Sequence, residues 1–390
     1  MNKFLQGLTA AILSLAFTAP PAVAEDVVKI GVILPLTGPY ADYGEEIGNG
    51  IKLYMKQNGD TVAGKKIAII IRDDTGIAPE ISKRHAQELL VQDKVDILAG
   101  FGLTPSALTV APLATQAKKA MVIMNAATSV ITTRSPYIVR LSHTLPQIST
   151  PMATYALKNG IKKAYTLVAD FGPGIDAETA FKKTFEAGGN KLVGAVRVPV
   201  TNVDFSSYLQ RIKDAAPEAV FMFLPPGSAT IAFLKEYKER GLDKAGIALL
   251  VTEDFLDDNL MDALGTAALG IVSTGHYSTA HDSPMNKAYV QAFAAAYGTK
   301  MRPNFMSVAG YDGMAAIYAA LKKTNGDADG DKLVAAMKGM QFESPRGPVT
   351  IDPETRDIIQ TVYFRRAELR NGKIYNIEFD EVKNFKDPGK

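Results

Sequence analysis

Short apolar runs alternate with amphipathic segments along most of the chain. A strand buried on both faces is a short continuous apolar run, whereas a helix covering a sheet repeats its apolar residues every three to four positions. The predicted strands are 29–34, 66–72, 95–99, 120–124, 164–169, 191–199, 219–224, 247–252 and 270–274. The predicted helices between them are 45–57, 79–92, 106–117, 177–186, 205–215 and 230–240. This order predicts an α/β fold with parallel sheets flanked by helices.

The strands form two series, which predicts two doubly wound parallel-sheet lobes. The first four strand–helix units end near residues 138–141, and the second series starts at Ala164. A chain of 390 residues exceeds the size that one hydrophobic core usually supports. Further helices are predicted at 286–297, 305–323 and 331–340, followed by a hairpin of 362–369 and 373–379. Because no long Gly/Ser-rich or Pro-rich linker separates the two series, we expect several short crossings between the lobes.

Residues 1–24 have the anatomy of a secretory signal peptide. Lys3 supplies the positive start, residues 4–19 the apolar centre, and Ala22-Val23-Ala24 the small-residue cleavage site. The chain contains no cysteine, so it has neither disulfides nor the residue that a lipoprotein needs for lipid attachment. We therefore expect a soluble periplasmic protein after cleavage. Removal of Lys3 changes the net charge from +2 to +1, which gives no electrostatic case for binding nucleic acid or an anionic membrane.

Two stretches resemble ligand-binding motifs but lack a required residue. Gly59–Lys66 nearly spells a P-loop, yet it ends in Lys66 instead of Ser or Thr and leads into a strand, so a turn is predicted. Asp327, Asp329 and Asp331 alternate as in a calcium loop, but the glycine and glutamate of that loop are missing. Capping of the following helix by Asp329 or Gly330 is the expected use.

Motifs for catalysis or for a cofactor are also missing. His276 and His281 have no third ligand close in the sequence and no zinc-site spacing, so we expect ordinary hydrogen-bonding histidines. No serine occupies a G-x-S-x-G elbow, and Gly100-Phe101-Gly102 lacks the third glycine of a dinucleotide-binding loop. We therefore expect no metal, no cofactor and no enzymatic activity, with a periplasmic hydrolase as the opposing hypothesis.

Polar and aromatic residues gather after the predicted strands, where open α/β sheets bind small molecules. Hydroxyl groups and helix N-terminal N–H groups near Thr104, Ser106 and Thr128 suit a carboxylate, and Glu253 suits an ammonium group. The aromatic candidates for an apolar wall are Tyr43, Phe101, Phe171 and Phe255. The alternative is that the Gly, Pro, Ser and Thr residues of these loops only form turns and cap helices.

Residues 28–44, VKIGVILPLTGPYADYG, resemble the opening strand and loop of type I periplasmic solute-binding proteins of ABC importers. The similarity is to the branched-chain amino-acid (Leu/Ile/Val) binding family, and it continues through 49–53, 73–74, 170–176 and 310–313. The resemblance implies two lobes, joined by three crossings, that close on a ligand. The implied N-terminal lobe is 25–142 plus 277–355, and the implied C-terminal lobe is 143–276 plus 356–390.

The resemblance also implies the roles of individual residues. The positions that hold the ligand's α-carboxylate are Thr104, Ser106, Ala126 and Thr128, and the acidic partner of an α-ammonium group is Glu253. The aromatic residue of the first loop is Tyr40 or Tyr43. Phe171 and Pro226 stand where the amino-acid binders place tyrosines, which makes the predicted site more apolar. That departure favours an aromatic acid, whereas Glu253 favours an amino acid, so both ligand classes stay open.

The expected function is capture of a small carboxylate by the periplasmic substrate-binding component of an ABC importer. The ligand would be a branched-chain or hydrophobic amino acid or an aromatic acid, and the protein partner would be an inner-membrane ABC permease. We expect the protein to act as a monomer. The alternative within the same fold is a ligand sensor that signals to a partner protein.

Overall fold

The computed structural model describes residues 26–201 and 203–389, and the predicted signal peptide lies outside them. Six strands form the first sheet in the order β2-β3-β1-β4-β5-β6. Their bounds are β1 (Val27–Leu34), β2 (Thr61–Val62), β3 (Lys65–Asp73), β4 (Ile97–Gly100), β5 (Ala120–Ile123) and β6 (Ile138–Arg140). All neighbours in this sheet are parallel except β2 and β3, which are antiparallel. We call the part of the molecule built on this sheet the N-terminal lobe.

The second sheet has the order β12-β13-β14-β11-β10-β9-β7-β8, and β15 pairs with β14. Its first strands are β7 (Lys163–Ala169), β8 (Lys191–Val198), β9 (Ala219–Phe223), β10 (Ala248–Thr252) and β11 (Val272–Gly275), which pair in parallel. The remaining strands, β12 (Gln341–Ser344), β13 (Gly347–Ile351), β14 (Ile358–Arg370) and β15 (Lys373–Phe385), are antiparallel. We call the part built on β7–β11 the C-terminal lobe.

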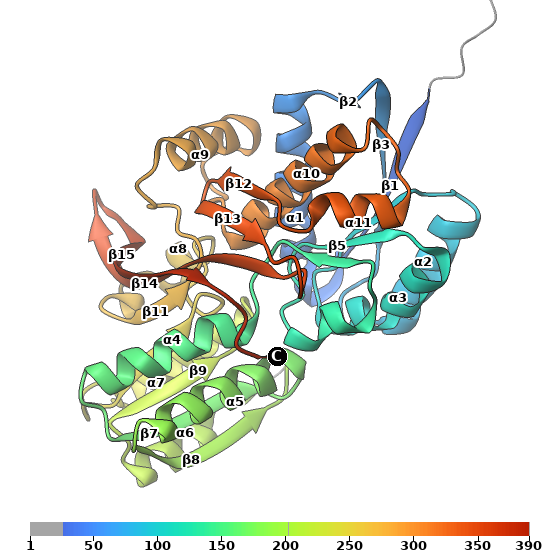
Figure 1. Ribbon diagram of the computed structural model, residues 1–390. Helices are drawn as coiled ribbons and strands as arrows, with labels where there is room; N and C mark the ends of the chain where they lie inside the picture. Colours follow the sequence, from blue (N-terminus) through green and yellow to red (C-terminus); the bar gives the residue numbers. More distant parts are fainter. Residues whose placement is uncertain (1–25, 202, 390) are drawn as a thin grey trace, which may run out of the picture.

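Helices cover both lobes (Figure 1). The helices before β7 are α1 (Ala41–Asn58), α2 (Pro79–Val91), α3 (Thr104–Ala117) and α4 (Leu145–Lys158). Next come α5 (Gly172–Ala187), α6 (Ser206–Ala215), α7 (Ser228–Glu239) and the short α8 (Met261–Leu264). The last three are α9 (Pro284–Tyr297), α10 (Phe305–Lys323) and α11 (Gly330–Met337). Short 3-10 helices are η1 (Gly38–Tyr40), η2 (Ser129–Arg134) and η3 (Gly265–Ala268).

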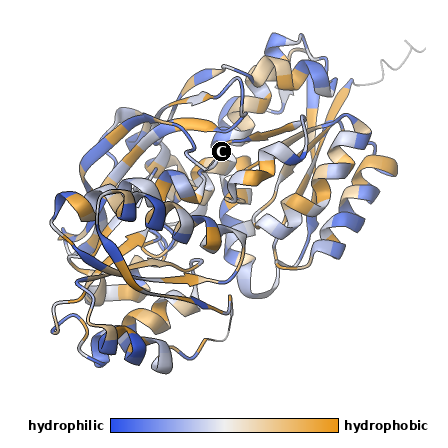
Figure 2. Ribbon diagram, turned by 60° about the horizontal axis from the view of Figure 1, so that its bottom comes forward, coloured by the Kyte–Doolittle hydropathy of each residue, from blue (hydrophilic) through white to orange (hydrophobic). Residues whose placement is uncertain are grey.

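Separate hydrophobic cores stabilise the two lobes. One core joins β1 and β5 to residues of α1, α10 and α11, and a second core packs α2 and α3 against the other face of the same sheet. A third core contains the strands β7, β9 and β10 with α5 and α7. In Figure 2, hydrophobic residues are frequent on the central strands, while the surrounding helices alternate between hydrophobic and hydrophilic residues. The predicted α/β fold with two lobes is therefore confirmed.

The chain passes between the lobes more than once. Residues 28–141 and 277–358 contribute to the core of the N-terminal lobe, while most residues of the third core lie within 145–272 and at 367 and 374. The long strand β14 takes part in both, because Ile358 belongs to the first core and Ala367 to the third. Ile358 lies in the first core although the implied C-terminal lobe begins again at 356, and the boundaries of the implied lobes stay a prediction.

Several local expectations are resolved by the structure. Gly59–Lys66 is a turn with the short hairpin β2–β3, and the Asp329 side chain accepts a hydrogen bond from Lys332 N as the N-cap of α11, so both predictions are confirmed. The helix predicted at 45–57 begins earlier than expected, because α1 already starts at Ala41, after Pro39 in η1. Helix α4 and strands β12 and β13 were not predicted.

Within 26–201 and 203–389, the structure contains no helix with the length and apolar character needed to span a bilayer.

Candidate functional site

A cavity of about 330 Å³, including its mouth, lies between the two lobes. Its lining residues mostly follow the carboxyl ends of parallel strands, which is where open α/β sheets bind ligands. They are Tyr43, Gly102, Leu103, Thr104, Asn125, Ala126, Ala127, His143, Leu145, Phe171, Pro173, Phe223, Pro225 and Asp254.

Two helix N-termini meet beside this cavity. Thr104 is the first residue of α3, and its hydroxyl lies 3.0 Å from the hydroxyl of Thr128. Gly172, the first residue of α5 in the other lobe, is so close that an added Cβ would lie 2.7 Å from Thr128 Oγ1. Within the described residues, neither N-cap side chain accepts a hydrogen bond from its helix. Because the second residue of each helix is a proline without an N–H group, the donors available to a ligand include those of Thr104 and Gly172. Both helix dipoles therefore favour an anion at this point.

A buried arginine stabilises the loop behind the two threonines. Arg140 donates hydrogen bonds to the carbonyl groups of Ala126 and Thr128, at 3.2 and 2.8 Å, and pairs with Asp357 at 2.9 Å. Its side chain is fully buried and is not part of the cavity wall. Arg140 therefore holds the loop that carries Ala126 and Thr128, and the donor groups next to the cavity that suit a carboxylate are hydroxyl and N–H groups.

Three aromatic side chains form much of the apolar wall. Tyr43 belongs to α1, and its hydroxyl donates a 3.3 Å hydrogen bond to the carbonyl of Pro226 in the other lobe. Phe171 and Phe223 of the C-terminal lobe stack with their ring centres 6.0 Å apart. Tyr40 packs edge-on against Tyr43, and it lines a neighbouring cavity together with Pro226. Of the predicted residues, Tyr43, Thr104, Ala126 and Phe171 line the central cavity, and Thr128 contacts Thr104.

Three predicted ligand contacts lie elsewhere. The Ser106 hydroxyl donates to Asp74 at 2.6 Å and accepts from Ser82 at 2.9 Å, so its side chain ties α3 to the end of β3. Phe101 is fully buried in the core that α2 and α3 form with the sheet. Phe255 is likewise buried, packed edge-on against Phe233. The structure corrects these assignments because each side chain points into a packed interior, a direction that a linear sequence does not reveal.

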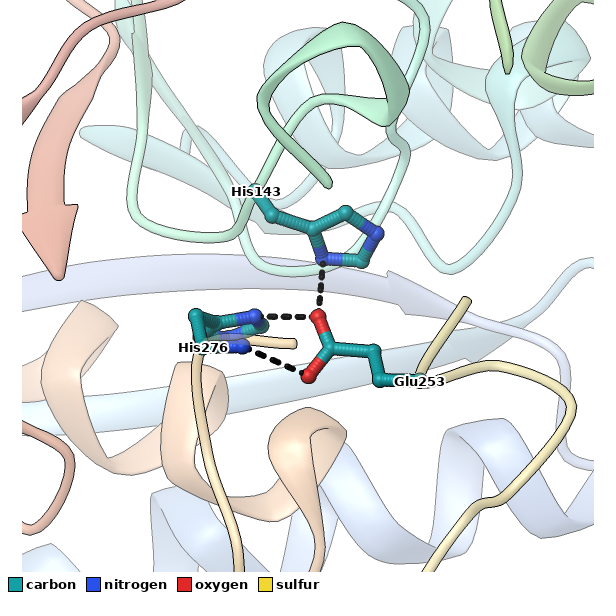
Figure 3. Close-up of side chains that lie close together, drawn as sticks. All are labelled: His143, Glu253 and His276. Atoms are coloured by element: carbon teal, nitrogen blue, oxygen red, sulfur yellow. Dashed lines mark hydrogen bonds and ion pairs between the residues drawn. The ribbon is translucent and has the colours of Figure 1, made fainter. Parts of the chain in front are cut away.

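Glu253 also differs from its predicted role. Its side chain is fully buried and accepts hydrogen bonds from the backbone N–H of His276 at 2.9 Å and from His276 Nδ1 at 2.5 Å. His143 Nδ1 lies 3.5 Å from the same carboxylate (Figure 3). His143 and Asp254 line the cavity, whereas Glu253 does not. The carboxylate predicted to bind an ammonium group is therefore engaged by histidines.

Burial controls the protonation of this cluster. Desolvation lowers the pKa of His143 to about 3, against the opposing effect of Glu253, and it also lowers the pKa of His276, with Arg346 and Arg365 adding to the shift. Burial, reinforced by the charge of Glu253, raises the pKa of Asp254 to about 8. Both histidines are therefore neutral at neutral pH, while Asp254 carries a proton in much of the population.

The expectation that His276 has no third ligand nearby is wrong in three dimensions. His143, Glu253 and His276 each present a potential metal-ligating atom, and these atoms lie within 4.8 Å of one another. The guanidinium groups of Arg346 and Arg365 disfavour positive charge on His276, and they would oppose a cation there in the same way. We therefore interpret the cluster as a buried hydrogen-bond network.

Two α/β lobes that enclose a ligand-sized cavity define a bilobal solute-binding protein. The chain belongs to the periplasmic binding protein family, whose profile matches residues 27–373. It is 45% identical over 97% of both chains to Leu/Ile/Val-binding protein homolog 6 of Brucella melitensis. The family resemblance inferred from the sequence is thus confirmed.

Solved structures of ABC transporter solute-binding proteins are also similar. One, from Rhodopseudomonas palustris BisB5 in complex with 3,4-dihydroxybenzoic acid, has 54% sequence identity and a TM-score of 0.90, with 94% of this chain and 99% of that chain covered. Another, from R. palustris with 4-hydroxybenzoate, has 45% identity and a TM-score of 0.91, with 93% and 99% covered. The fold of this chain is therefore that of substrate-binding components of ABC transporters.

Proposed function

We propose that this protein is the periplasmic substrate-binding component of an ABC importer and that it captures an aromatic carboxylate. The observation that carries the proposal is the convergence of α3 and α5 on Thr104 and Thr128, beside a cavity with aromatic walls. Two uncapped helix ends and two hydroxyl groups suit the carboxylate, and Tyr43, Phe171 and Phe223 suit an aromatic ring.

The burial and the hydrogen bonds of Glu253 favour an aromatic acid over an α-amino acid as the ligand. An ammonium ligand needs an accessible carboxylate, but Glu253 is fully buried and His276 already donates to both of its oxygens. The remaining acid, Asp254, has a pKa raised to about 8 by burial, which weakens it as a partner for a cation. The aromatic acids bound by the two R. palustris proteins point to the same ligand class.

A thermal-shift and calorimetric screen tests the proposal. The purified mature chain is titrated with benzoate, 4-hydroxybenzoate, 3,4-dihydroxybenzoate and L-leucine, and each ligand is recovered afterwards for chemical analysis. We expect saturable binding of at least one aromatic acid, weaker or absent binding of leucine, and recovery of unchanged ligand. Binding of leucine alone would contradict the ligand assignment, and chemical conversion would favour the hydrolase hypothesis.

The assembly is part of the same proposal. We infer lobes of 25–142 plus 277–355 and 143–276 plus 356–390, a monomer in the periplasm, and an inner-membrane permease as the protein partner. The distribution of the hydrophobic cores supports the two lobes. Size-exclusion chromatography with light scattering is expected to give the mass of one mature chain, with and without ligand, and a dimer mass would contradict the monomer.

A further inference from the structure

Two side chains of the cavity wall have polar atoms without a partner. His143 is 1% exposed, and among the described residues neither of its ring nitrogens has a hydrogen-bond partner. Asp254 Oδ2 is buried and, within the same part of the chain, has no partner either. Leaving buried polar atoms unpaired costs roughly 1–3 kcal/mol each. Both side chains line the cavity. His143 Nδ1 faces the carboxylate of Glu253 at 3.5 Å, so His143 Nε2 and Asp254 Oδ2 are the atoms for which a ligand is the natural partner.

The spacing of these atoms suits one bridging oxygen. His143 Nε2 and Asp254 Oδ2 are 3.9 Å apart, which is too far for a direct hydrogen bond. An oxygen atom about 2.8 Å from each would fit between them with ordinary hydrogen-bond lengths. A hydroxyl group can donate one hydrogen bond and accept another, so it can serve both atoms at once.

His143 can accept a hydrogen bond from that hydroxyl group, and Asp254 can donate one to it. His143 Nδ1 faces Glu253 Oε1 at 3.5 Å, and the other ring nitrogen points away from this carboxylate (Figure 3). Because burial keeps His143 neutral, a proton on Nδ1 directed at Glu253 leaves Nε2 as an acceptor. Asp254, whose pKa is raised to about 8, is the donor in its protonated form.

Glu253 is itself held in place by His276. The backbone N–H of His276 donates to one carboxylate oxygen at 2.9 Å, and its ring Nδ1 contacts the other at 2.5 Å. Gly275 leaves room for this arrangement, since an added Cβ would lie 2.5 Å from Glu253 Oε2. The orientation of His143 therefore depends on two residues that do not line the cavity.

We propose that His143 and Asp254 form a subsite for a ring hydroxyl group of the bound aromatic acid, with Glu253 and His276 as positioning residues for His143. The hydroxyl donates to His143 Nε2 and accepts from Asp254. This inference rests on the proposed function and deepens it, because it assigns hydroxylated benzoates, in preference to benzoate itself, as the ligand class.

Isothermal titration calorimetry of the full mature chain tests the subsite. The probes are benzoate, 4-hydroxybenzoate, 3,4-dihydroxybenzoate and 4-chlorobenzoate, which has a substituent that cannot donate a hydrogen bond. For the wild type, we expect a hydroxylated probe to bind at least about tenfold more tightly than benzoate and 4-chlorobenzoate. A ligand without a hydroxyl group leaves both His143 Nε2 and Asp254 buried without a hydrogen-bond partner.

Variants then show whether this preference depends on the two residues. His143→Leu and Asp254→Leu are expected to reduce the ratio of hydroxylated-probe affinity to benzoate affinity to about threefold or less, because each removes one hydrogen-bonding group. Asp254→Asn keeps an N–H donor at the same place and is expected to retain the preference. Glu253→Gln should also reduce the preference, because the orientation of His143 is loosened. His281→Leu is the matched control: His281 pairs with Glu378 at 2.9 Å outside the cavity, and its loss should leave the preference unchanged.

The outcomes separate this inference from the proposed function. Equal loss of benzoate and hydroxybenzoate affinity in both cavity variants, or equal binding of all four probes by the wild type, would overturn the hydroxyl subsite while leaving aromatic-acid binding intact. Failure of the wild type to bind any of the four probes would overturn the proposed function before any variant is made. Asp254→Leu keeps the branched shape of the side chain while removing the donor, so the test stays decisive if His143→Leu does not fold.

Discussion

At the scale of single residues, the carboxylate subsite depends on hydroxyl groups in place of cations. Arg140, the closest arginine to the loop of Thr128, is turned toward backbone carbonyls and Asp357. The anion is consequently expected to be stabilised by neutral donors at helix ends. Such hydrogen bonds to a charged group are worth about 1.5–3 kcal/mol each.

Replacement of Thr104 by valine tests this arrangement. Valine has nearly the same shape as threonine, so Thr104→Val removes the hydroxyl at the cavity wall with little change in packing. We expect the affinity for 4-hydroxybenzoate to fall roughly tenfold or more in a calorimetric titration. Thr133→Val is the control, because the Thr133 hydroxyl bonds to Val130 O on an exposed turn. Equal affinities of the two variants would rule out a role for the Thr104 hydroxyl.

The buried acids near the cavity predict how stability depends on pH. The pKa is raised to about 8 for Asp254, about 7 for Asp257 and about 6 for Asp312, in each case first by burial. A carboxyl whose pKa is higher in the folded state binds its proton more tightly there. Its stabilising contribution is present at low pH and is lost as pH rises through the folded-state value.

Unfolding by urea at several pH values checks this dependence. Between pH 6.5 and 8.5 the free energy of unfolding should decrease, by up to about 1.4 kcal/mol per pH unit for each carboxyl that still binds a proton. Below pH 6.5 the neutral histidines act in the opposite direction, because the lowered pKa of His143 favours unfolding as acid protonates it. Asp254→Asn should flatten the decrease above pH 7. Stability that rises from pH 6.5 to 8.5 would contradict these assignments.

At the scale of secondary-structure elements, the first turn of α3 is attached to the end of β3 by hydrogen bonds, and its first residue faces the cavity. Ser106, in its first turn, shares Asp74 with Ser82 through hydrogen bonds of 2.6 and 3.0 Å. This attachment fixes the position of the helix terminus, while Thr104 faces the cavity. The two hydroxyl groups, close in sequence, thus have different roles.

Substitution of Ser106 distinguishes these roles. Ser106→Ala removes one of the two serine hydroxyl groups that donate to the buried carboxylate of Asp74, so we expect a loss of about 1–3 kcal/mol in the free energy of unfolding. Ligand affinity should change by less than about threefold, in contrast to Thr104→Val. A large loss of affinity without a loss of stability would instead support the direct carboxylate contact implied by the family resemblance.

Elements with a regular apolar pattern could be predicted from the sequence, whereas elements defined by long-range contacts could not. The strands 29–34 and 219–224 were recognised because both faces are buried, which makes them continuous apolar runs. Helix α4 was missed because Pro146 and Pro151 interrupt its pattern, although Pro146 lies in the first turn, where proline is tolerated. Strand β12 was missed because three of its four residues are at least partly exposed.

The candidate site follows the same rule. Thr104 and Thr128 could be predicted because they follow strands that meet at one sheet edge. His143 precedes the unpredicted α4, and its significance arises only from Glu253 and Asp254, which come from a distant part of the chain. The adjacent carboxyl groups of Glu253 and Asp254 were visible in the sequence, but which one faces the cavity depends on strand orientation at the end of β10.

At the scale of the whole molecule, the two lobes are in direct contact around the cavity. Besides the Tyr43–Pro226 hydrogen bond, Asn259 of the C-terminal lobe donates to Glu46 of α1 at 2.7 Å. Gly172 completes the contact, because its backbone packs directly against Thr104 and Thr128. The N-termini of α3 and α5, one from each lobe, are adjacent in this arrangement, so the proposed anion site needs both lobes together.

A methyl group at position 172 should interfere with this contact between the lobes. The Cβ of Gly172→Ala would lie 2.7 Å from Thr128 Oγ1, so we expect ligand affinity to fall at least about tenfold while each lobe stays folded. Small-angle X-ray scattering should show that ligand no longer compacts the variant. Gly48→Ala is the control, since its Cβ would have only an ordinary 3.9 Å contact. Normal compaction of Gly172→Ala by ligand would show that closure does not need this close approach.

The central claim is that the cleft between the lobes captures an aromatic carboxylate by its acid group. A crystal structure of the complex with 4-hydroxybenzoate tests it most directly. We predict electron density in the cavity between Tyr43 and Phe171, with the carboxylate within hydrogen-bond distance of Thr104 or Thr128 and the N-terminus of α3. Density with the carboxylate at His143 and the hydroxyl at the threonines, or a ligand bound outside this cavity, would contradict the account.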